Sequence, residues 1–463
     1  MATRMRRGRG RYRGGVPALC SAVVWGSGQV LNRQLGKGLI FLTSFVGVVT
    51  SEVVTGHYLL GGRGYSPRAN GGWIVHGLWG LVTLGTRPRT MTTSGLTSGD
   101  NSVTLLADGM ITLFGVLLLV ALWWWNVRDA WTTARERAGG RPTASTRQWL
   151  RSLWQRSTAY VMLTPSALLV LFVSVLPIVF GILIAFTSYD RDHTPPAHLV
   201  RWVGLDNFTT VLRVGSWART FAGVLTWTVV WALLATLTTY FLGFVQAVLL
   251  TRRDVLWPRL WRSVLILPWA VPAMVSALVF RSMFNGQFGP VSGFLVDMGI
   301  TDQRVNWFTD PNQPNLARAV ALLVNLWLGF PYFMALISGT LTNIDSSLYE
   351  AARIDGASGL QTFRAITLPI VYWATAPLLI MSFVSNFNSF GVVYFLTQGG
   401  PADPSYQYAG DTDLLITWLY KLTLDNRMYN IGSVMSILIF VVVGSFSVWN
   451  LRRSRAMEGA DLS

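Results

Sequence analysis

The chain contains 463 residues, of which 51% are hydrophobic and 13% are charged, with a formal net charge of +16. Soluble domains carry about 25% charged residues, so this composition excludes an ordinary soluble domain and indicates a polytopic membrane protein. In so apolar a chain, the positive charge is expected to orient helices in a bilayer and not to bind nucleic acid.

A basic segment opens the chain, with six arginines between Arg4 and Arg13. It resembles the start of a secretory signal peptide, but no small-residue cleavage site follows the apolar run 16–25. We therefore expect an uncleaved tail with an interfacial helix. Cys20 is the only cysteine, which excludes an internal disulfide, and the bulky Leu19 before it argues against lipid attachment.

Eight later segments are long and apolar enough to span a membrane, because a spanning helix needs about 20 apolar residues. They lie at approximately 38–56, 105–126, 160–187, 222–250, 264–285, 316–341, 370–397 and 431–451. A shorter apolar stretch, 73–85, is expected to lie in the membrane interface. The predicted fold is therefore all-α, with eight transmembrane helices.

Arginine and lysine placement predicts that both termini are cytoplasmic. In that orientation the cytoplasmic stretches hold 24 of these residues and the external loops hold 11, and positive charge is retained on the cytoplasmic side. A linker at 127–158 separates two spans from six. The predicted domains are a basic tail (1–37), a two-span region with its linker (38–157), a six-span core (158–455) that includes a cytoplasmic element (342–369), and a cytoplasmic tail (456–463).

Prolines interrupt three of the core spans, at Pro268 and Pro272, at Pro331 beside Gly329, and at Pro377. Proline removes a backbone donor and breaks the local hydrogen-bond ladder. Non-helical backbone at membrane depth survives only where protein or a water-filled cavity satisfies it. Spans five to seven are thus the predicted lining of a pathway.

The hydrophilic element 342–369 is predicted to be a helix, a glycine bend and a second helix. Ser347 and Glu350 are spaced as a capping box, which predicts a helix start near Leu348. Gly356 is placed to end that helix, because glycine tolerates the left-handed conformation at a helix C-terminus. The second helix is expected to run to about Ile366, before Pro369 enters the seventh span. The alternative is a plain hydrophilic hairpin between two spans.

The pattern Glu350-Ala-Ala, Gly356, Ile366-x-Leu-Pro369 resembles the loop of permease subunits of binding-protein-dependent ABC importers. In that family the loop is the coupling helix, which docks on a cytoplasmic ATPase. The resemblance implies that the docking residues are Glu350, Ala351, Ala352, Asp355 and Gly356.

Further motifs resemble the MalF-type maltose/maltodextrin permeases, including Asn325–Tyr332, Ser382–Phe390, Gly399-Gly-Pro401 and Thr412–Leu415. The similarity covers roughly residues 160–451 and implies a six-helix MetI/MalF-like core preceded by two extra spans. The enterobacterial members carry a large external domain after span three. Here only the residues 188–221 are available for it.

Two polar stripes follow helical spacing, at i, i+3, i+4 and i+7. Hydroxyls, amides and an aromatic ring on facing helices suit a neutral sugar, although such residues also join membrane helices to one another. The resemblance implies that the stripes are the sugar site. Their members are Asn325, Leu328, Gly329 and Tyr332, and Ser382, Ser385, Asn386 and Ser389. At the positions of Ser385 and Ser389, the family has a bulkier aromatic residue and an asparagine, respectively.

Several sequence features that other classes of membrane protein require are absent from this chain. No Gly-x-x-x-x-Gly-Lys-Ser/Thr sequence occurs, so the chain is not itself the ATPase. The six core spans have no interior Asp or Glu, which argues against an ion-coupled transporter. Four histidines and one cysteine give no metal-site spacing, and no catalytic residue is assigned. A lipid-linked glycosyltransferase remains the alternative, but the external aspartates form no paired motif.

The resemblance implies an inner-membrane permease that imports a carbohydrate, of which maltose, maltodextrin or a related α-glucoside is the leading candidate. The implied partners are a second, MalG-type permease, a MalK-type ATPase dimer that binds ATP and Mg²⁺, and an extracytoplasmic sugar-binding protein. No cofactor is expected on this chain itself.

Overall fold

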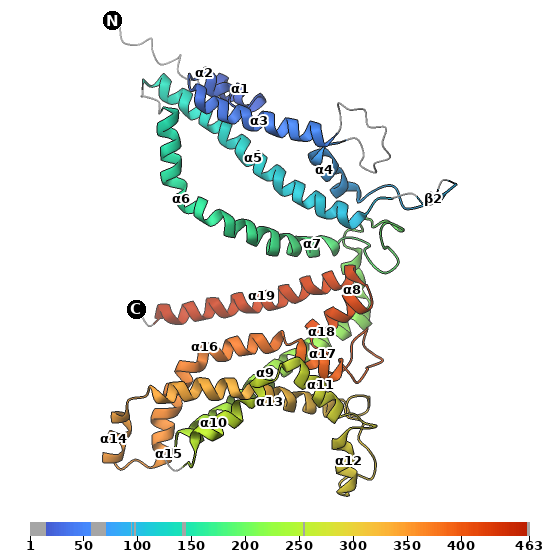
Figure 1. Cartoon of the computed structure of the whole chain (residues 1–463), viewed down its shortest axis with the longest axis vertical. Coiled ribbons are helices and arrows are strands. Elements are labelled where there is room, and N and C mark those ends of the chain that lie inside the picture. The colour runs from blue at the N-terminus through green and yellow to red at the C-terminus, as the bar shows by residue number, and fades with distance from the viewer. Residues whose placement is uncertain are drawn as a thin grey trace. The chain divides into compact units, whose positions relative to one another are not determined.

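The structure is a computed structural model that describes residues 15–56, 71–93, 95–96, 99–140, 145–252 and 255–460. The basic segment 1–14 lies outside the described residues. Internal packing divides the chain into two units, Met1–Asn207 and Phe208–Ser463. Almost every regular element is a helix (Figure 1), which confirms the all-α prediction. The predicted domain boundaries rest on linker composition and stay predictions.

The first unit contains long and short helices and one small hairpin. Its elements are α1 Gly15–Val23, α2 Ser27–Leu31, α3 Leu35–Thr55, α4 Trp73–Thr83, β1 Met91–Thr92, β2 Gly95–Leu96, α5 Ser102–Ala138, α6 Thr146–Val170, the π-helical turn η1 Leu171–Val175 and α7 Leu176–Ile184. The strands are antiparallel, with Met91 opposite Leu96. Helix α8, Asp206–Arg213, spans the boundary of the two units.

A buried polar cluster fastens the N-terminal helices of this unit to α5. Lys37 Nζ lies 2.6 Å from Asp129 Oδ1, and both side chains are largely buried. Gln29 donates to the Asn126 carbonyl and to Asp129, and Asn32 donates to the Ala130 carbonyl. Buried charges are tolerated when they are paired and hydrogen-bonded. Gln29 and Asn32, which follow the apolar run 16–25, are therefore packing contacts with α5.

The second unit contains the remaining helices. They are α9 Gly215–Thr251, α10 Pro258–Ile266, the 3₁₀ turn η2 Leu267–Ala270, α11 Ala273–Met283, α12 Pro290–Asp297, α13 Pro314–Thr342, α14 Ser346–Ile354, α15 Gly359–Thr362, the π-helical turn η3 Phe363–Thr367, α16 Leu368–Phe387, α17 Gly391–Thr397, α18 Leu415–Tyr420, the π-helical turn η4 Lys421–Asp425 and α19 Tyr429–Ala460.

Helix α9 lies at the centre of this unit and packs along both α13 and α16. Two apolar clusters form on it. One contains Trp227, Trp231, Ala235, Ala277, Phe284, Val320, Ala321, Val324, Val393, Leu396 and Leu414. The other contains Phe244, Ala247, Phe333, Ile337, Leu341 and Val371. Polar residues on α9 are consequently enclosed between its neighbours, where each needs a hydrogen-bond partner.

Six helical runs in the described part of the chain are long and apolar enough to cross a membrane, and a bent pair makes seven if it counts as one. The six runs are α3, α5, Ser157–Ile184, α9, α13 and Gly359–Thr397. The bent pair, Pro258–Ala270 and Ala273–Met283, turns by 88° at the predicted proline break. The predicted eighth span falls in α19, where the segment Tyr429–Ser445 is apolar within a helix that continues to Ala460. The count of eight stays a prediction.

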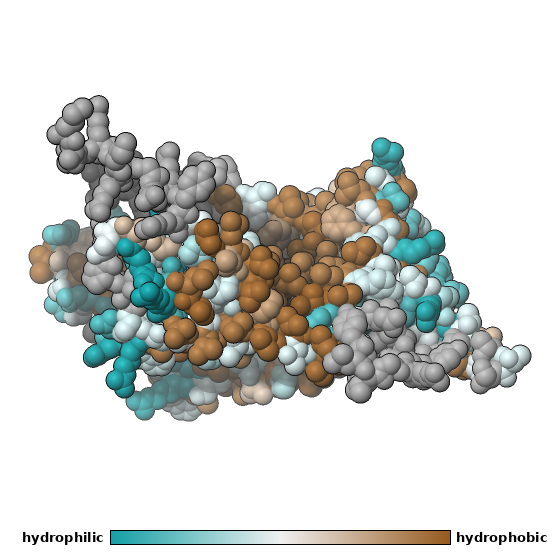
Figure 2. Space-filling view, turned by 90° about the horizontal axis from the view of Figure 1, so that it is seen from above, coloured by the Kyte–Doolittle hydropathy of each residue, from teal (hydrophilic) through white to brown (hydrophobic). Residues whose placement is uncertain are grey.

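Exposed apolar side chains cover these helices. On the face seen in Figure 2, hydrophobic residues occupy the middle and hydrophilic residues lie toward both ends. On α3 and α5, for example, Leu39, Val46, Leu117 and Trp124 are exposed. Soluble proteins rarely expose contiguous apolar surface of this kind, whereas a bilayer requires it.

Candidate functional site

Helix α14, the predicted coupling element, begins at an aspartate. The carboxylate of Asp345 accepts a hydrogen bond of 2.9 Å from the Ser347 amide. The predicted capping box of Ser347 and Glu350, with a start near Leu348, is therefore wrong. Asp345 satisfies a free amide of the first turn two residues earlier than expected. The same backbone hydrogen bond holds the pKa of the exposed Asp345 carboxyl below its usual value.

Gly356 ends α14 as predicted. Its φ is +72°, in the left-handed region that costs a residue with a Cβ about 1–2 kcal/mol. The Gly356 amide donates to the Arg353 carbonyl at 3.1 Å, and the Ala357 amide donates to the Ala352 carbonyl at 2.9 Å. These two bonds are the Schellman arrangement of a helix C-terminus. The end of α14 is thus fixed by the backbone.

The surface of α14 is open in this chain. The five predicted docking residues, Glu350, Ala351, Ala352, Asp355 and Gly356, have no fully buried member. Beside them, Ile354 is 86% exposed. Ala351 lies three residues before Ile354, so the two share one face of the helix.

A π-helical turn, η3, joins α15 to α16. Ser358 and Gln361 form a capping box at the start of α15, and the helix continues through η3 without a stop. Pro369 lacks an amide hydrogen, and in η3 the Leu368 amide donates to the Phe363 carbonyl, five residues back. The second helix therefore does not end near Ile366 as predicted. It changes from α-helix to π-helix and back, and continues into α16.

One side-chain hydrogen bond connects the coupling element directly to this turn. The hydroxyl oxygens of Tyr349, on α14, and Thr367, in η3, are 3.1 Å apart. Thr367 is buried, and Phe363 of the same turn packs edge-on against Phe244 of α9 at 5.8 Å between ring centroids. Helix α14 is thus linked to the base of both α16 and α9.

Three of the four predicted residues of the seventh-span stripe lie on α16. Asn386 Nδ2 lies 3.5 Å from Ser382 Oγ, which brings these two together, whereas Ser385 is exposed. Ser389 lies beyond the helix, because α16 ends at Phe387. The expected i+7 position of Ser389 on the same helical face is therefore wrong. The following residues form a break before α17.

The stripe on α13 faces α9 in part. Gly329 approaches α9 so closely that a Cβ there would lie 2.7 Å from Thr239 Cγ2. Asn325 is only 7% exposed, and Leu328 packs against the apolar cluster of α9. A glycine at this position lets the two helix backbones come together, as small residues do in membrane bundles.

Tyr332 links this stripe to the broken fifth segment. Its side chain is 38% exposed, and its ring centroid lies 6.2 Å from that of Trp269 in η2 and 5.1 Å from that of Phe333. Pro331 lies inside α13 without ending it. An exposed aromatic face beside a helix bend is available to stack on a ligand ring.

Sequence reasoning missed two threonines of α9 that join the stripes. Thr236 Oγ1 accepts a hydrogen bond of 2.9 Å from Asn386 Nδ2 on α16. Thr239, one turn later, meets Gly329 on α13. The run Thr236, Thr238, Thr239, Tyr240 in an apolar span was the available signal, because polar residues in such a span need partners. Among the described residues, no group of three metal-ligating side chains occurs.

Known proteins share this organisation. The family described as "Binding-protein-dependent transport system inner membrane component" matches residues 239–455. The galactooligosaccharides transport system permease protein GanP of Bacillus subtilis (strain 168) is 37% identical over 443 residues, covering 95% of this chain and 98% of that protein. The maltodextrin transport system permease protein MdxF of the same organism is 32% identical, covering 95% of this chain and 96% of that protein.

A solved structure supports the fold. A bacterial ABC transporter involved in the import of the acidic polysaccharide alginate superposes with a TM-score of 0.52 at 22% identity, covering 67% of this chain and 98% of that one. The relatives are named as transport permeases, which leaves the membrane-enzyme alternative without support. The chain therefore belongs to the family of binding-protein-dependent transport system inner membrane components, as a MalF-type transport permease and not an enzyme.

Proposed function

We propose that this permease forms half of the translocation pathway of an ATP-driven carbohydrate importer, and that a second, MalG-type permease forms the other half. The observation that carries the proposal is the exposed α14, which ends in a fixed glycine turn and is bonded through Tyr349 to the helix that carries Ser382 and Asn386. A helix so attached transmits displacement at its surface to α16.

A MalK-type ATPase dimer is the proposed partner of α14. Both termini and α14 face the cytoplasm in this proposal, supported by the arginine and lysine distribution. ATP and Mg²⁺ bind to the ATPase and not to this chain. An extracytoplasmic binding protein delivers the sugar to the opposite side, and alternating access moves the sugar through spans five to seven.

The proposed substrate is a neutral oligosaccharide, either a maltodextrin or related α-glucoside, or a galactooligosaccharide. The named substrates of the two relatives support this class. Asn325, Ser382 and Asn386 offer amides and a hydroxyl, and Tyr332 offers a ring face. Ser385 and Ser389 are small where the family has larger side chains, which suits a bulkier sugar.

Gly356→Trp tests the coupling role. Tryptophan combines a Cβ at positive φ with a large ring on the docking surface, so we expect the variant to insert normally but to lose sugar-stimulated ATP hydrolysis. The measurement is ATPase activity of the complete transporter in proteoliposomes, with and without loaded binding protein.

Gly181→Trp is the matched control. Gly181 lies on α7, and an added Cβ meets nothing within 4 Å there, as at Gly356. We expect this variant to keep its stimulated activity. Wild-type stimulation in Gly356→Trp would contradict the proposed coupling element.

A further inference from the structure

A cavity of about 400 Å³ lies in the second unit, at the end of α13 far from α14. Its side-chain lining includes Arg281, Asn285, Trp307, Phe308, Thr309 and Gln398. Since α13 has 29 residues at about 1.5 Å each, about 43 Å of helix separates this cavity from the coupling element. In the predicted orientation the cavity is external, and it contains none of the stripe residues.

A hydrogen bond and a ring contact fix the position of Trp307 in the lining of the cavity. Trp307 Nε1 donates to Ser292 Oγ at 2.7 Å, and Ser292 Oγ donates to the Val305 carbonyl at 3.2 Å. Phe284 packs against Trp307 edge to face, with the ring centroids 5.0 Å apart. Both Trp307 and Phe308 are half-buried, so each still contributes surface to the cavity.

The polar rim carries donors in excess of its internal bonds. Arg281 Nη2 donates to Gln398 Oε1 at 3.0 Å, which uses one of the five guanidinium hydrogens. Asn285 Oδ1 accepts from the amides of Gln287 and Phe288, each at 2.9 Å. That leaves the Asn285 amide hydrogens as donors. Gln398 adopts a φ of +52°, a strained conformation that the surrounding structure must enforce.

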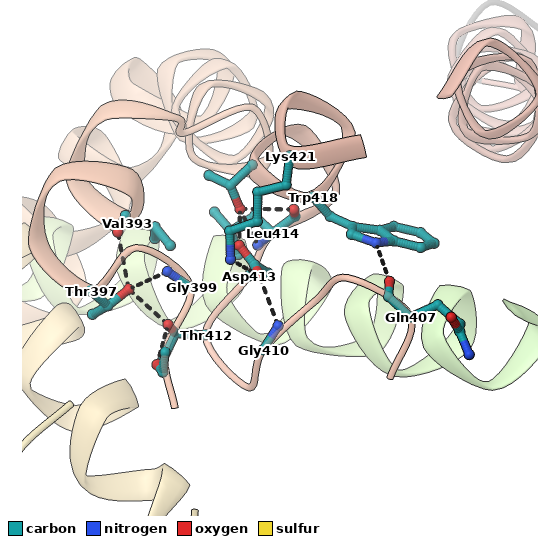
Figure 3. Close-up of polar contacts among 12 residues, drawn as sticks. Val393, Thr397, Gly399, Gln407, Gly410, Thr412, Asp413, Leu414, Trp418 and Lys421 are labelled. Atoms are coloured by element: carbon teal, nitrogen blue, oxygen red, sulfur yellow. Dashed lines mark hydrogen bonds and ion pairs between the residues drawn. The ribbon is translucent and has the colours of Figure 1, made fainter. Parts of the chain in front are cut away.

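The segments next to Gln398 are held by hydrogen bonds among buried side chains (Figure 3). Thr397 and Thr412 share a hydrogen bond of 2.7 Å, and Thr412 also donates to the Gly400 carbonyl. The carboxylate of Asp413, with none of its side chain exposed, receives bonds from Lys421 at 2.6 Å and from the Gly410 amide at 2.8 Å. Burial raises the pKa of this carboxyl, and Lys421 opposes the rise.

We propose that this cavity is a second saccharide subsite, which holds one glycosyl unit of a neutral oligosaccharide before it enters the pathway. Its volume falls in the range of small-ligand sites, and ring faces combined with a few convergent donors are typical of such sites. The rings of Trp307 and Phe308 stack on the sugar, and Arg281, Asn285 and Gln398 bind its hydroxyls. This subsite rests on the proposed import of oligosaccharides.

The single native cysteine makes a protection experiment direct. In a Cys20→Ser background, Thr309→Cys places a thiol at an exposed lining position, and Gln303→Cys places one at an exposed position outside the lining. The complete transporter in nanodiscs is reacted with a maleimide, with and without maltotriose or galactotriose and without binding protein. At ten times the dissociation constant, we expect the sugar to slow modification of Thr309→Cys about tenfold and to leave Gln303→Cys unchanged.

Added Phe308→Leu or Trp307→Ala changes are expected to abolish the protection. Protection that requires the binding protein and not the sugar would make the cavity a protein-docking surface and overturn the subsite. If neither maltotriose nor galactotriose protected Thr309→Cys, the subsite would be overturned as well.

The Asn386→Ala variant separates this proposal from the proposed function. We expect it to lose uptake yet keep the protection of Thr309→Cys by sugar, because the two sites are distinct. Loss of protection in this variant would count against an independent subsite. Normal sugar-stimulated hydrolysis in Gly356→Trp would contradict the coupling proposal alone and leave the protection result as it stands.

Discussion

Asn386 combines a structural and a proposed functional contact. Its amide nitrogen donates to Thr236 on α9 and lies near Ser382 on its own helix. Hydrogen bonds between membrane helices average about 0.6 kcal/mol, which corresponds to about a threefold effect on an equilibrium. A larger loss on changing Asn386 must therefore come from something other than this helix contact.

Asn386→Ala and Thr236→Val distinguish the two roles. Both remove the same interhelical hydrogen bond, but only the first removes the amide proposed to bind sugar. We expect Thr236→Val to change the KM of uptake about threefold at most, and Asn386→Ala to reduce uptake at least about tenfold, with unchanged docking of the binding protein. Radiolabelled sugar uptake measures both, and equal effects would remove Asn386 from the sugar site.

Tyr349 is the second residue with a separable role. Tyr349→Phe deletes only the hydroxyl that meets Thr367, a bond whose net value is about 0.5–1.5 kcal/mol. We expect sugar-stimulated ATP hydrolysis to fall severalfold while basal hydrolysis stays constant. Tyr372→Phe, at a half-exposed position on α16, is the control and should behave as wild type. A Tyr349→Phe variant with full stimulation would exclude this link from coupling.

At the scale of elements, π-helical turns accompany two prolines. Turn η1 ends two residues before Pro177, and η3 ends two residues before Pro369. In each case the proline cannot donate to the carbonyl four residues earlier, and the wider turn keeps the helix continuous. The helix is therefore continuous ahead of Pro177 and Pro369, whereas the chain turns by 88° between Ala270 and Ala273, where Pro272 lies.

The loop before α18 depends on its buried ion pair. Lys421→Met leaves the Asp413 carboxylate, which has no exposed surface, without its counter-ion, and breaking such a pair costs about 3–5 kcal/mol. Asp413→Asn added to Lys421→Met keeps an acceptor for the Gly410 amide without a charge. We expect the double variant to have a higher melting temperature than Lys421→Met in a thermal unfolding assay of the purified permease. A lower melting temperature for the double variant would contradict this account.

At the scale of the whole chain, the orientation in the membrane decides which end of the second unit can meet the proposed ATPase. In the Cys20→Ser background, we expect Glu350→Cys to react with a membrane-impermeant maleimide only in inverted vesicles. Gln303→Cys should react in intact cells. Labelling of Glu350→Cys in intact cells would reverse the topology and exclude the ATPase as the partner of α14.

Much of this architecture could be predicted from the sequence, and the exceptions have physical causes. Apolar length located α3, α5, α9 and α13, and glycine placement located the end of α14. The start of α14 was misplaced because Asp345 competes with Ser347 for the same cap. Thr236 and Thr239 were overlooked because their role depends on which helices surround α9, which spacing along the chain does not reveal.

The 88° turn between α10 and α11 has a consequence for the membrane itself. Helix α11 has 11 residues and rises only about 16 Å, roughly half the thickness of the hydrocarbon layer. If α11 runs along the bilayer normal, the backbone at Val271 stands at mid-depth, where its polar groups need a partner in the protein or water in a cavity. The Pro272 carbonyl already accepts a hydrogen bond from the Ser276 amide. Water that reached Val271 would enter about halfway through the bilayer, and the permeability barrier beside this segment would then be about half the hydrocarbon layer.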